Sequence, residues 1–245
     1  MCRLHWCPAY YLSVPLGVYN PAILFSGNWL VLDTLLTTKL YIPPRPPSLV
    51  PRKRLADRLS DGTRTRLVLV SAPAGFGKTI LLGDWARDIK WPNVWVSLDQ
   101  DDDDLLRFLT YVIVSLQKAI GHDFGELILA GFQATQQPSV ESTLSMLINE
   151  AASVPEDFVL ILDDYHLVEQ PSIHQALTFL LEHLPPQMHL VIASRSDPPL
   201  PLARLRVRGE LVEIRDGDLR FTPEETAVFL KNVMDLELSP LTFPP

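Results

Sequence analysis

Cysteine is almost absent from this chain of 245 residues, and the two that it has, Cys2 and Cys7, lie at the extreme N-terminus. The remaining sequence therefore offers neither a disulfide framework nor a cysteine-based metal site. No further ligands follow Cys2 and Cys7 at a recognisable spacing, which argues against a metal-binding pair. Such sparing use of cysteine fits a reducing compartment, and we expect a cytoplasmic location.

A long apolar run is also missing. The most apolar early stretch, Ala22 to Leu36, is short and is interrupted by Gly27, Asn28 and Asp33. It is too short to span a bilayer, and it lacks the charged start and the cleavage pattern of a secretory signal. We therefore expect no membrane association, and we interpret residues 1–37 as a leader of undetermined role.

Positive charge is not in excess. The chain has 21 Lys and Arg against 29 Asp and Glu, which gives a formal net charge of −8. A nucleic-acid-binding protein needs a basic surface, and no helix-turn-helix pattern is recognisable here. We therefore expect no direct nucleic-acid binding by this segment.

The most informative motif that is present is Ala72-Pro73-Ala74-Gly75-Phe76-Gly77-Lys78-Thr79. It follows the apolar run Leu67 to Val70 and precedes a helix-like segment, which is the layout of a phosphate-binding loop. Glycines let the backbone curl so that N–H groups point inward, and the helix start adds unpaired N–H groups and a positive dipole end. We expect Lys78 to reach the β- and γ-phosphates and Thr79 to ligate Mg²⁺.

The general pattern begins with glycine, and here that position is Ala72. A glycine-containing turn between any strand and helix is the alternative, but Gly-x-Gly-Lys-Thr directly after an apolar strand disfavours it. The motif therefore predicts that the nucleotide is contacted by Ala74, Gly75, Phe76, Gly77, Lys78, Thr79 and Ile80. We also expect a catalytic role for Lys78.

A second part of the site follows a later apolar run. Asp163 and Asp164 come directly after Phe158 to Leu162, and carboxylates at the end of a buried strand face the crevice in which an α/β sheet binds its ligand. We expect Asp163 to hold Mg²⁺ and Asp164 to orient or deprotonate the attacking water. The alternative is an Asp pair that only makes a turn soluble, which the four preceding aliphatic residues disfavour.

Arg195 ends another apolar run, His189 to Ser194. If that strand lies between the first and third strands, its tip comes near the γ-phosphate, where an arginine could distinguish ATP from ADP. We therefore place Arg195 among the catalytic residues, and a surface arginine paired with an acid is the alternative.

Alternating strand-like and helix-like segments predict an α/β fold with three layers and a mostly parallel five-stranded sheet. The predicted strands are Leu67–Ser71, Asn93–Leu98, Phe158–Leu162, His189–Ser194 and Leu211–Ile214. The predicted helices are Lys53–Leu59, the segment from Ile80, Leu105–Ile120, 141–153, a run containing Ile173 to Leu184, and Pro223–Met234 with a cap at Thr222. We divide the chain into the leader 1–37, a proline-rich arm and first helix 38–62, a P-loop NTPase domain 63–216, and the start of a helical subdomain 217–245 that is cut short.

Three other polar groups receive structural interpretations. Asp99 and Asp101 to Asp104 favour a solvated helix start over a cation site, because acids stabilise the positive end of a helix. His166 is interpreted as a structural or solvent-facing histidine, although it lies near the acids. Arg204, Arg206 and Arg208 are interpreted as a solvated helix face.

Together these motifs resemble the nucleotide-binding region of the large ATP-dependent LuxR-type transcriptional regulators, which belong to the signal-transducing ATPases with numerous domains (STAND). The resemblance covers about residues 38 to 235 and suits an Ala at position 72. The sequence that carries it comprises Thr38-Lys39-Leu40, Val50-Pro51-Arg52, Ser71 to Thr79, Trp95 to Asp99, Leu162 to His166, Ser194-Arg195, Leu205 to Arg208 and Leu219 to Thr222.

The resemblance implies a sheet order of 5-1-4-3-2 and places Val50 and Arg52 near adenine. It implies an ATP- and Mg²⁺-dependent switch that rests with ADP, and self-association of the ATP-bound form. Such regulators are several times longer and bind DNA through a C-terminal domain. We therefore expect this chain to be a fragment, a truncated gene product or a misassigned open reading frame, which lacks the sensor, the DNA-binding domain and the elements that close over ADP.

Three functions remain open at this point. The leading one is a slowly hydrolysing ATP switch of a transcriptional regulator, which makes the chain a weak ATPase that serves regulation. A P-loop phosphotransferase acting on a small molecule is the second, although no convincing basic lid motif is present. A degenerate scaffold that binds nucleotide weakly is the third.

Overall fold

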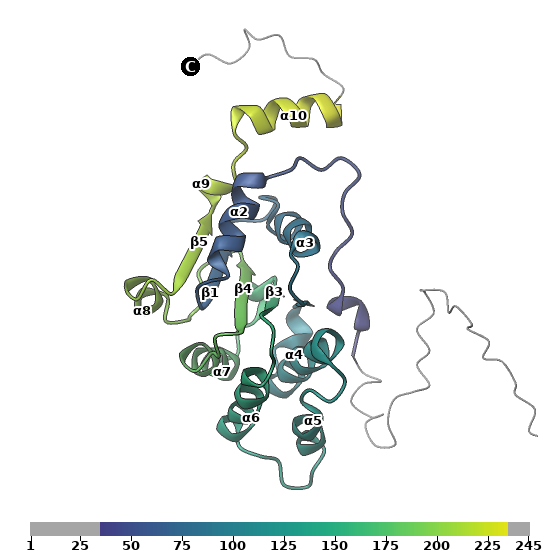
Figure 1. The fold of residues 1–245 in the computed structure, drawn as a ribbon, viewed down its shortest axis with the longest axis vertical. Helices are drawn as coiled ribbons and strands as arrows, with labels where there is room; N and C mark the ends of the chain where they lie inside the picture. Colours follow the sequence, from purple (N-terminus) through teal and green to yellow (C-terminus); the bar gives the residue numbers. More distant parts are fainter. Residues whose placement is uncertain (1–34, 235–245) are drawn as a thin grey trace, which may run out of the picture. The chain divides into compact units, whose positions relative to one another are not determined.

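A parallel five-stranded sheet forms the centre of the chain in a computed structural model, which describes residues 35–234 (Figure 1). The order across the sheet is β2-β3-β4-β1-β5, which confirms the expected order 5-1-4-3-2. All four neighbouring pairs are parallel, so the carboxyl ends of the strands lie at one edge. The strands are β1 (Leu67–Ser71), β2 (Asn93–Ser97), β3 (Phe158–Asp163), β4 (Met188–Ser194) and β5 (Leu211–Arg215).

Helices connect consecutive strands, as parallel pairing requires. The α-helices are α2 (Lys53–Gly62), α3 (Lys78–Asp88), α4 (Leu105–Ile120), α5 (Glu126–Phe132), α6 (Val140–Ala152), α7 (Pro171–Glu182), α8 (Leu202–Val207), α9 (Asp216–Leu219) and α10 (Pro223–Met234). Three 3₁₀ turns, η2 (Thr37–Leu40), η3 (Gln100–Asp102) and η4 (Tyr165–Leu167), complete the described elements.

The sheet is covered on both faces, since its central strands β1, β3 and β4 are largely apolar and are buried at every position. On one face, Val159 and Ile161 of β3 pack with residues of α2 and α3, including Leu55 and Trp85. On the other face, Leu160 packs against α4, α6 and α7. Figure 1 shows α4, α6 and α7 grouped on the side of the sheet away from α2 and α3. Three layers therefore follow directly from unbroken apolar strands.

The strand and helix bounds agree closely with those expected from the sequence. Helix α4 begins and ends at the expected residues, and β1 does so as well. Helix α7 ends at Glu182, before the predicted last turn at Leu184, although Leu184 is buried. The predicted cap of α10 is present, since the Glu225 amide donates to the Thr222 hydroxyl at 3.2 Å. Helices α5 and α9 were not predicted, whereas α8 carries Arg204 and Arg206, which were interpreted as part of a solvated helix face.

The expectation of a solvated acidic helix start was wrong for two of its residues. Asp102 is fully buried, and Asp103 accepts hydrogen bonds from the backbone of Glu169 and Gln170. The carboxylate of Asp102 contacts the ammonium of Lys39 at 2.7 Å, and the guanidinium of Arg107 at 3.2 Å. A buried ionised group persists only when it is paired, and Asp102 has two cationic partners. The turn between β2 and α4 therefore contains a buried ion-pair cluster and not a solvated row of acids.

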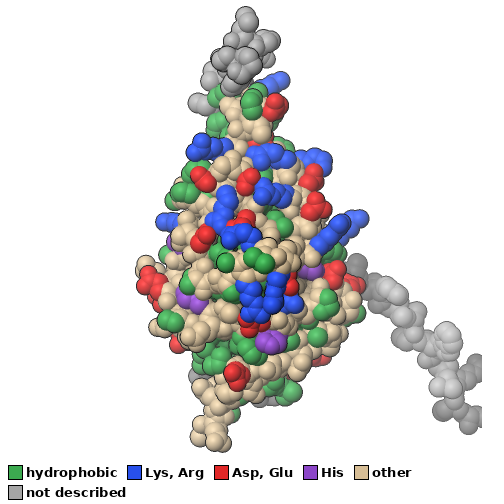
Figure 2. Space-filling model, turned by 90° about the vertical axis from the view of Figure 1, so that its left-hand side faces the viewer, with side chains coloured by type: hydrophobic (Ala, Val, Ile, Leu, Met, Phe, Trp, Pro, Cys, Tyr) green, Lys and Arg blue, Asp and Glu red, His purple; other side chains and the backbone are tan. Residues whose placement is uncertain are grey.

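Arginine and lysine side chains gather over the side of the molecule that carries β5 and α8, with acidic side chains between them (Figure 2). Arg204 pairs with Glu182, and Arg206 pairs with Glu213 at 2.8 Å. Arg208 is exposed, as expected for a solvated helix face. Within residues 35–234, no helix is long and apolar enough to cross a bilayer. The predictions for Cys2, Cys7 and the first 34 residues concern a part of the chain outside the described residues.

Candidate nucleotide site

The loop from Ala72 to Gly77 joins β1 to α3 at the carboxyl edge of the sheet. Gly75 and Gly77 have φ angles of 84° and 76°, a region that residues with a Cβ atom rarely adopt. Apart from the adjoining residues of the loop, no atom lies within 4 Å of where a Cβ would stand on either glycine, so there is open space beside both glycines. Gly77 caps α3 without a side-chain hydrogen bond, which leaves the first N–H groups of the helix available to an anion.

Lys78 is turned into this loop. Only 7% of the residue is exposed, and its ammonium donates to the carbonyl oxygens of Ala72 at 2.7 Å and Pro73 at 3.1 Å. Burial lowers the pKa of Lys78, while the charges of Asp164 and Asp163 act in the opposite direction. The ammonium therefore lies on the side of the loop that faces the two acids, where it can exchange its carbonyl partners for phosphate oxygens.

Asp163 and Asp164 take different environments at the end of β3. Asp163 is 2% exposed and lies beside the hydroxyl of Thr79. Burial and the neighbouring charge of Asp164 raise the pKa of Asp163 to about 6. The side chain of Asp164 is 42% exposed, and its backbone has a φ of 57°, in the left-handed region. One carboxylate is thus inside the site beside Thr79, and the other faces the opening.

Arg195 follows β4, which lies between β1 and β3 as its predicted role required. The backbone places it beside the loop, because the Ala72 amide donates to the Ser194 carbonyl oxygen at 3.2 Å. Arg195 is exposed, and its charge lowers the pKa values of both Lys78 and His166. The structure therefore brings Arg195 to the same edge as Lys78 and the acid pair.

His166 belongs to this group, although the sequence was interpreted otherwise. Its side chain is 11% exposed, and its Nδ1 lies 3.8 Å from Asp164 Oδ1. Both ring nitrogens are buried and have no hydrogen-bond partner among the described residues. A buried imidazole without a partner is costly unless something else binds it. Its position three residues after Asp163, in a turn that starts at the strand end, was the signal that could have revealed it.

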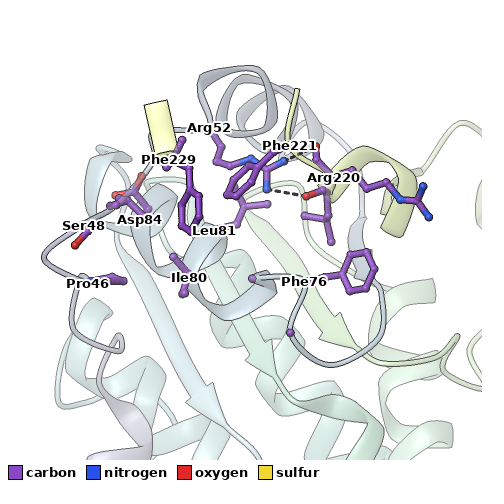
Figure 3. A pocket seen from close by; sticks show the side chains of 15 residues that line it. Pro46, Ser48, Arg52, Phe76, Ile80, Leu81, Asp84, Arg220, Phe221 and Phe229 are labelled. Carbon is purple, nitrogen blue, oxygen red and sulfur yellow. Dashed lines mark hydrogen bonds between the residues drawn. The ribbon is translucent and has the colours of Figure 1, made fainter. Parts of the chain in front are cut away.

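A largely apolar cavity of about 440 Å³ lies next to the loop (Figure 3). Figure 3 shows Phe221 and Phe229 on one side of it, above Ile80 and Leu81 of α3. Its lining includes the predicted contacts Gly75, Phe76, Gly77, Ile80, Val50 and Arg52. It does not include the other predicted contacts, Lys78, Thr79 and the exposed Ala74. An apolar cavity of this size suits a flat aromatic base and a sugar.

The guanidinium of Arg52 is directed at the chain rather than into the cavity. It donates to the carbonyl oxygens of Leu219 at 2.9 Å and Arg220 at 3.0 Å, and it lies 4.8 Å from the centre of the Phe221 ring (Figure 3). Arg54 also donates to the Arg220 carbonyl, at 2.9 Å. These contacts hold the segment after β5 against the arm. That segment supplies part of the cavity wall, although the sequence led us to expect no closing elements.

The site has the donor chemistry that a magnesium-bound nucleotide needs. The Thr79 hydroxyl and the Asp163 carboxylate lie together beside the Lys78 ammonium, at the open loop. In the described part of the chain, no group of three or more His, Cys, Asp or Glu side chains could hold a metal ion alone. Mg²⁺ in phosphate sites takes only one or two protein ligands and completes its shell with phosphate and water, so this set fits it.

Comparison with known proteins identifies the relatives. The HTH-type transcriptional regulator MalT of Cronobacter sakazakii is 40% identical over 196 residues, which are 80% of this chain and 21% of the regulator. MalT of Klebsiella pneumoniae is 40% identical over 195 residues. The chain is a homologue of part of MalT. It spans about a fifth of the length of these MalT proteins.

The fold agrees with this relationship. A STAND protein with a tetratricopeptide repeat sensor from Pyrococcus horikoshii matches with a TM-score of 0.53 and 19% identity, over 78% of this chain and 26% of that one. The chain therefore shares its fold with this STAND protein. No protein-family model matches the chain.

Proposed function

We propose that this chain is the nucleotide-binding switch module of a MalT-type transcriptional regulator, which binds ATP with Mg²⁺, hydrolyses it slowly and rests with ADP. The observation that supports the proposal is that a phosphate-binding type of loop and an apolar cavity lie next to each other. An open glycine loop with an inward-turned lysine and an acid pair adjoins an apolar cavity of about 440 Å³. A phosphate chain and a base are the two ends of one ligand that such a site accommodates.

Separate residues serve the phosphates and the metal. The curled backbone from Ala74 to Gly77 and the start of α3 supply N–H donors, and Lys78 supplies a positive charge for the β- and γ-phosphates. Thr79 and Asp163 hold Mg²⁺, which contributes neutralisation of the phosphate charge when it is bound. On the other side, Val50, Phe76 and Ile80 contact the base, and Arg52 contributes by holding the cavity wall.

The residues that follow β3 and β4 serve hydrolysis. Asp164 orients the attacking water and accepts its proton, since its carboxylate faces the opening. Arg195 stabilises the charge on the γ-phosphate. The ring nitrogens of His166 are buried beside Asp164 and have no hydrogen-bond partner within residues 35–234, so His166 supplies a hydrogen bond to the same water or to the phosphate. All three groups distinguish ATP from ADP, which is the difference in affinity that a switch requires.

The same proposal covers the organisation of the protein. The arm and first helix (38–62) and the P-loop domain (63–216) form the site, and the segment from 217 begins a helical subdomain that closes over it. DNA binding belongs to parts of such regulators that this chain does not span. We further propose a cytoplasmic location and self-association of the ATP-bound form.

Calorimetric titration with Mg-ATP and Mg-ADP tests the proposal. The wild type should bind both nucleotides, and Lys78→Ala should weaken binding about a hundredfold or more, because it loses charge-assisted hydrogen bonds to two phosphates. Lys90→Ala is the matched control, since Lys90 is exposed and has no partner within residues 35–234. It should bind like the wild type. Near-normal ATP affinity in Lys78→Ala would refute the assignment of the loop.

A further inference from the structure

The loop after β3, which carries the proposed catalytic groups Asp164 and His166, is held at its C-terminal end by hydrogen bonds to an acid from another part of the chain. This loop begins at Asp164, continues through η4 and ends at Gln170, the cap of α7. One oxygen of Asp103, in the turn between β2 and α4, accepts hydrogen bonds from the backbone N–H groups of Glu169 at 2.9 Å and Gln170 at 2.7 Å. A carboxylate that accepts two N–H groups is a strong fixed point, because both hydrogen bonds are charge-assisted.

The near end of the loop holds an unfavourable backbone conformation. Asp164 has φ 57° and ψ 35°, and it is the single residue other than glycine with positive φ among the residues that the structure describes. Such a conformation persists only where the surrounding structure holds the chain on both sides of it. On the β3 side, the Leu98 amide donates to the Asp163 carbonyl oxygen at 3.0 Å. On the other side, the Tyr165 hydroxyl forms a hydrogen bond with His174 Nδ1 at 2.7 Å, and Asp103 holds the end of the loop at Glu169 and Gln170.

Asp103 can act as a fixed point because its neighbours in the turn are anchored. Asp102 is fully buried and is bonded to Lys39 and Arg107. Asp104 caps α4 by accepting from the Arg107 amide at 2.9 Å. The position of Asp103 is therefore set by the buried ion pair on one side and by α4 on the other.

We propose that Asp103 is a positioning residue for ATP hydrolysis: it holds the loop that places Asp164 and His166 at the γ-phosphate. The inference rests on the proposed function. Asp103 does not line the cavity and is not part of the glycine loop. Its loss therefore lowers the rate of the chemical step and leaves nucleotide affinity unchanged, because the groups that bind the phosphates and the base lie on other segments.

Single-turnover hydrolysis and nucleotide titration, carried out on the same variants of the whole chain, test this split. Asp103→Ala should slow single-turnover hydrolysis about tenfold or more, since small displacements of catalytic groups are costly. Its dissociation constants for Mg-ADP and for a non-hydrolysable ATP analogue should stay within about twofold of the wild type. Asp103→Asn keeps an acceptor oxygen and should recover most of the rate. Asp101→Ala is the matched control, because Asp101 is exposed in the same turn and its carboxylate has no partner among the residues described.

Hydrogen exchange supplies a readout that does not depend on activity. The Glu169 and Gln170 amides should exchange faster in Asp103→Ala than in Asp101→Ala, without nucleotide present. If the alanine variant does not fold, Asp103→Ser, whose side chain is too short to reach both amides, must show the same split. Equal rates in Asp103→Ala and Asp101→Ala, or equal losses of rate and affinity, would overturn this inference alone. A wild type that neither binds nor hydrolyses ATP would overturn the proposed function, and the inference with it.

Discussion

Replacing Asp163 with asparagine should stabilise the nucleotide-free chain at neutral pH, although Asp163 is proposed to bind the metal. The carboxyl group is 2% exposed, and burial, together with the charge of Asp164, raises its pKa from 3.8 to about 6. The hydroxyl of Thr79 and the charge of Lys78 only partly offset these effects. At neutral pH the folded chain therefore carries an ionised carboxylate in surroundings that favour the protonated form. Asparagine has nearly the same shape and no charge.

The size of the effect follows from the difference in pKa between the folded and unfolded states. A rise of about 2 pKa units corresponds to about 3 kcal/mol, at about 1.4 kcal/mol for each unit. Because the folded pKa is the higher one, the cost of ionisation is fully present above about pH 6 and shrinks as the pH falls toward 3.8. Asparagine, which does not ionise, escapes this cost. The stabilisation should be about 1–3 kcal/mol at about pH 7.5 and clearly smaller at about pH 5.

Urea denaturation in the presence of a chelator measures this difference, because bound Mg²⁺ would otherwise offset the cost in the wild type. Asp101→Asn is the control for the loss of one exposed negative charge and should change stability by less than about 0.5 kcal/mol at either pH. The reasoning would be refuted by an Asp163→Asn variant that is less stable than the wild type at about pH 7.5, or by a difference that does not depend on pH.

Three further predictions concern other parts of the site. Asp164→Asn should bind Mg-ATP like the wild type but lose hydrolysis by about a hundredfold or more in a phosphate-release assay, since proton transfer to the carboxylate is lost; unchanged turnover would show that another group handles the water. Lys39→Ala should lower the unfolding free energy by about 3 kcal/mol in urea denaturation, because buried Asp102 loses one of its two cations; a change no larger than that of Lys90→Ala would contradict this. Arg52→Ala should weaken ADP binding about tenfold, as measured by titration, because two charge-assisted hydrogen bonds to the cavity wall are lost; unaltered affinity would show that the wall does not need this arginine.

Much of the fold could be predicted because its signals are local. The strands β1, β3 and β4 are buried at every position, and each contains a run of at least four apolar residues in the sequence. The glycine-containing motif between β1 and α3 predicts both the end of the strand and the start of the helix. Helix α5 gave no such signal, since it has only seven residues and starts after Gly125 without a side-chain cap. Short helices that depend on packing have weak sequence patterns.

Side chains whose roles depend on distant partners were harder to predict. Asp102 lies in a run of acids. Nothing in the neighbouring sequence shows that it is buried in the folded chain, where it pairs with Lys39, 63 residues earlier. His166 was interpreted as structural or solvent-facing although it lies near the acids, because its other charged neighbours, Arg195 and Lys78, come from distant segments. In each case the sequence gives the correct residue type, but the partner is fixed only when the sheet brings separate loops to one edge.

Arg52 shows how this limits inference about the nucleotide itself. The resemblance implies that Arg52 lies near adenine. In the structure Arg52 is one of the residues that line the cavity, but its guanidinium is bonded to carbonyl groups 167 and 168 residues later in the chain. The cavity wall is therefore shared by the arm, the start of α3 and the segment around Phe221. Because no one of these segments encloses the base alone, base binding and docking of the segment after β5 must favour each other, and the coupling is reciprocal. A nucleotide that fills the cavity then stabilises the contacts of Arg52, which gives the proposed switch a direct route from the ligand to the start of the next subdomain.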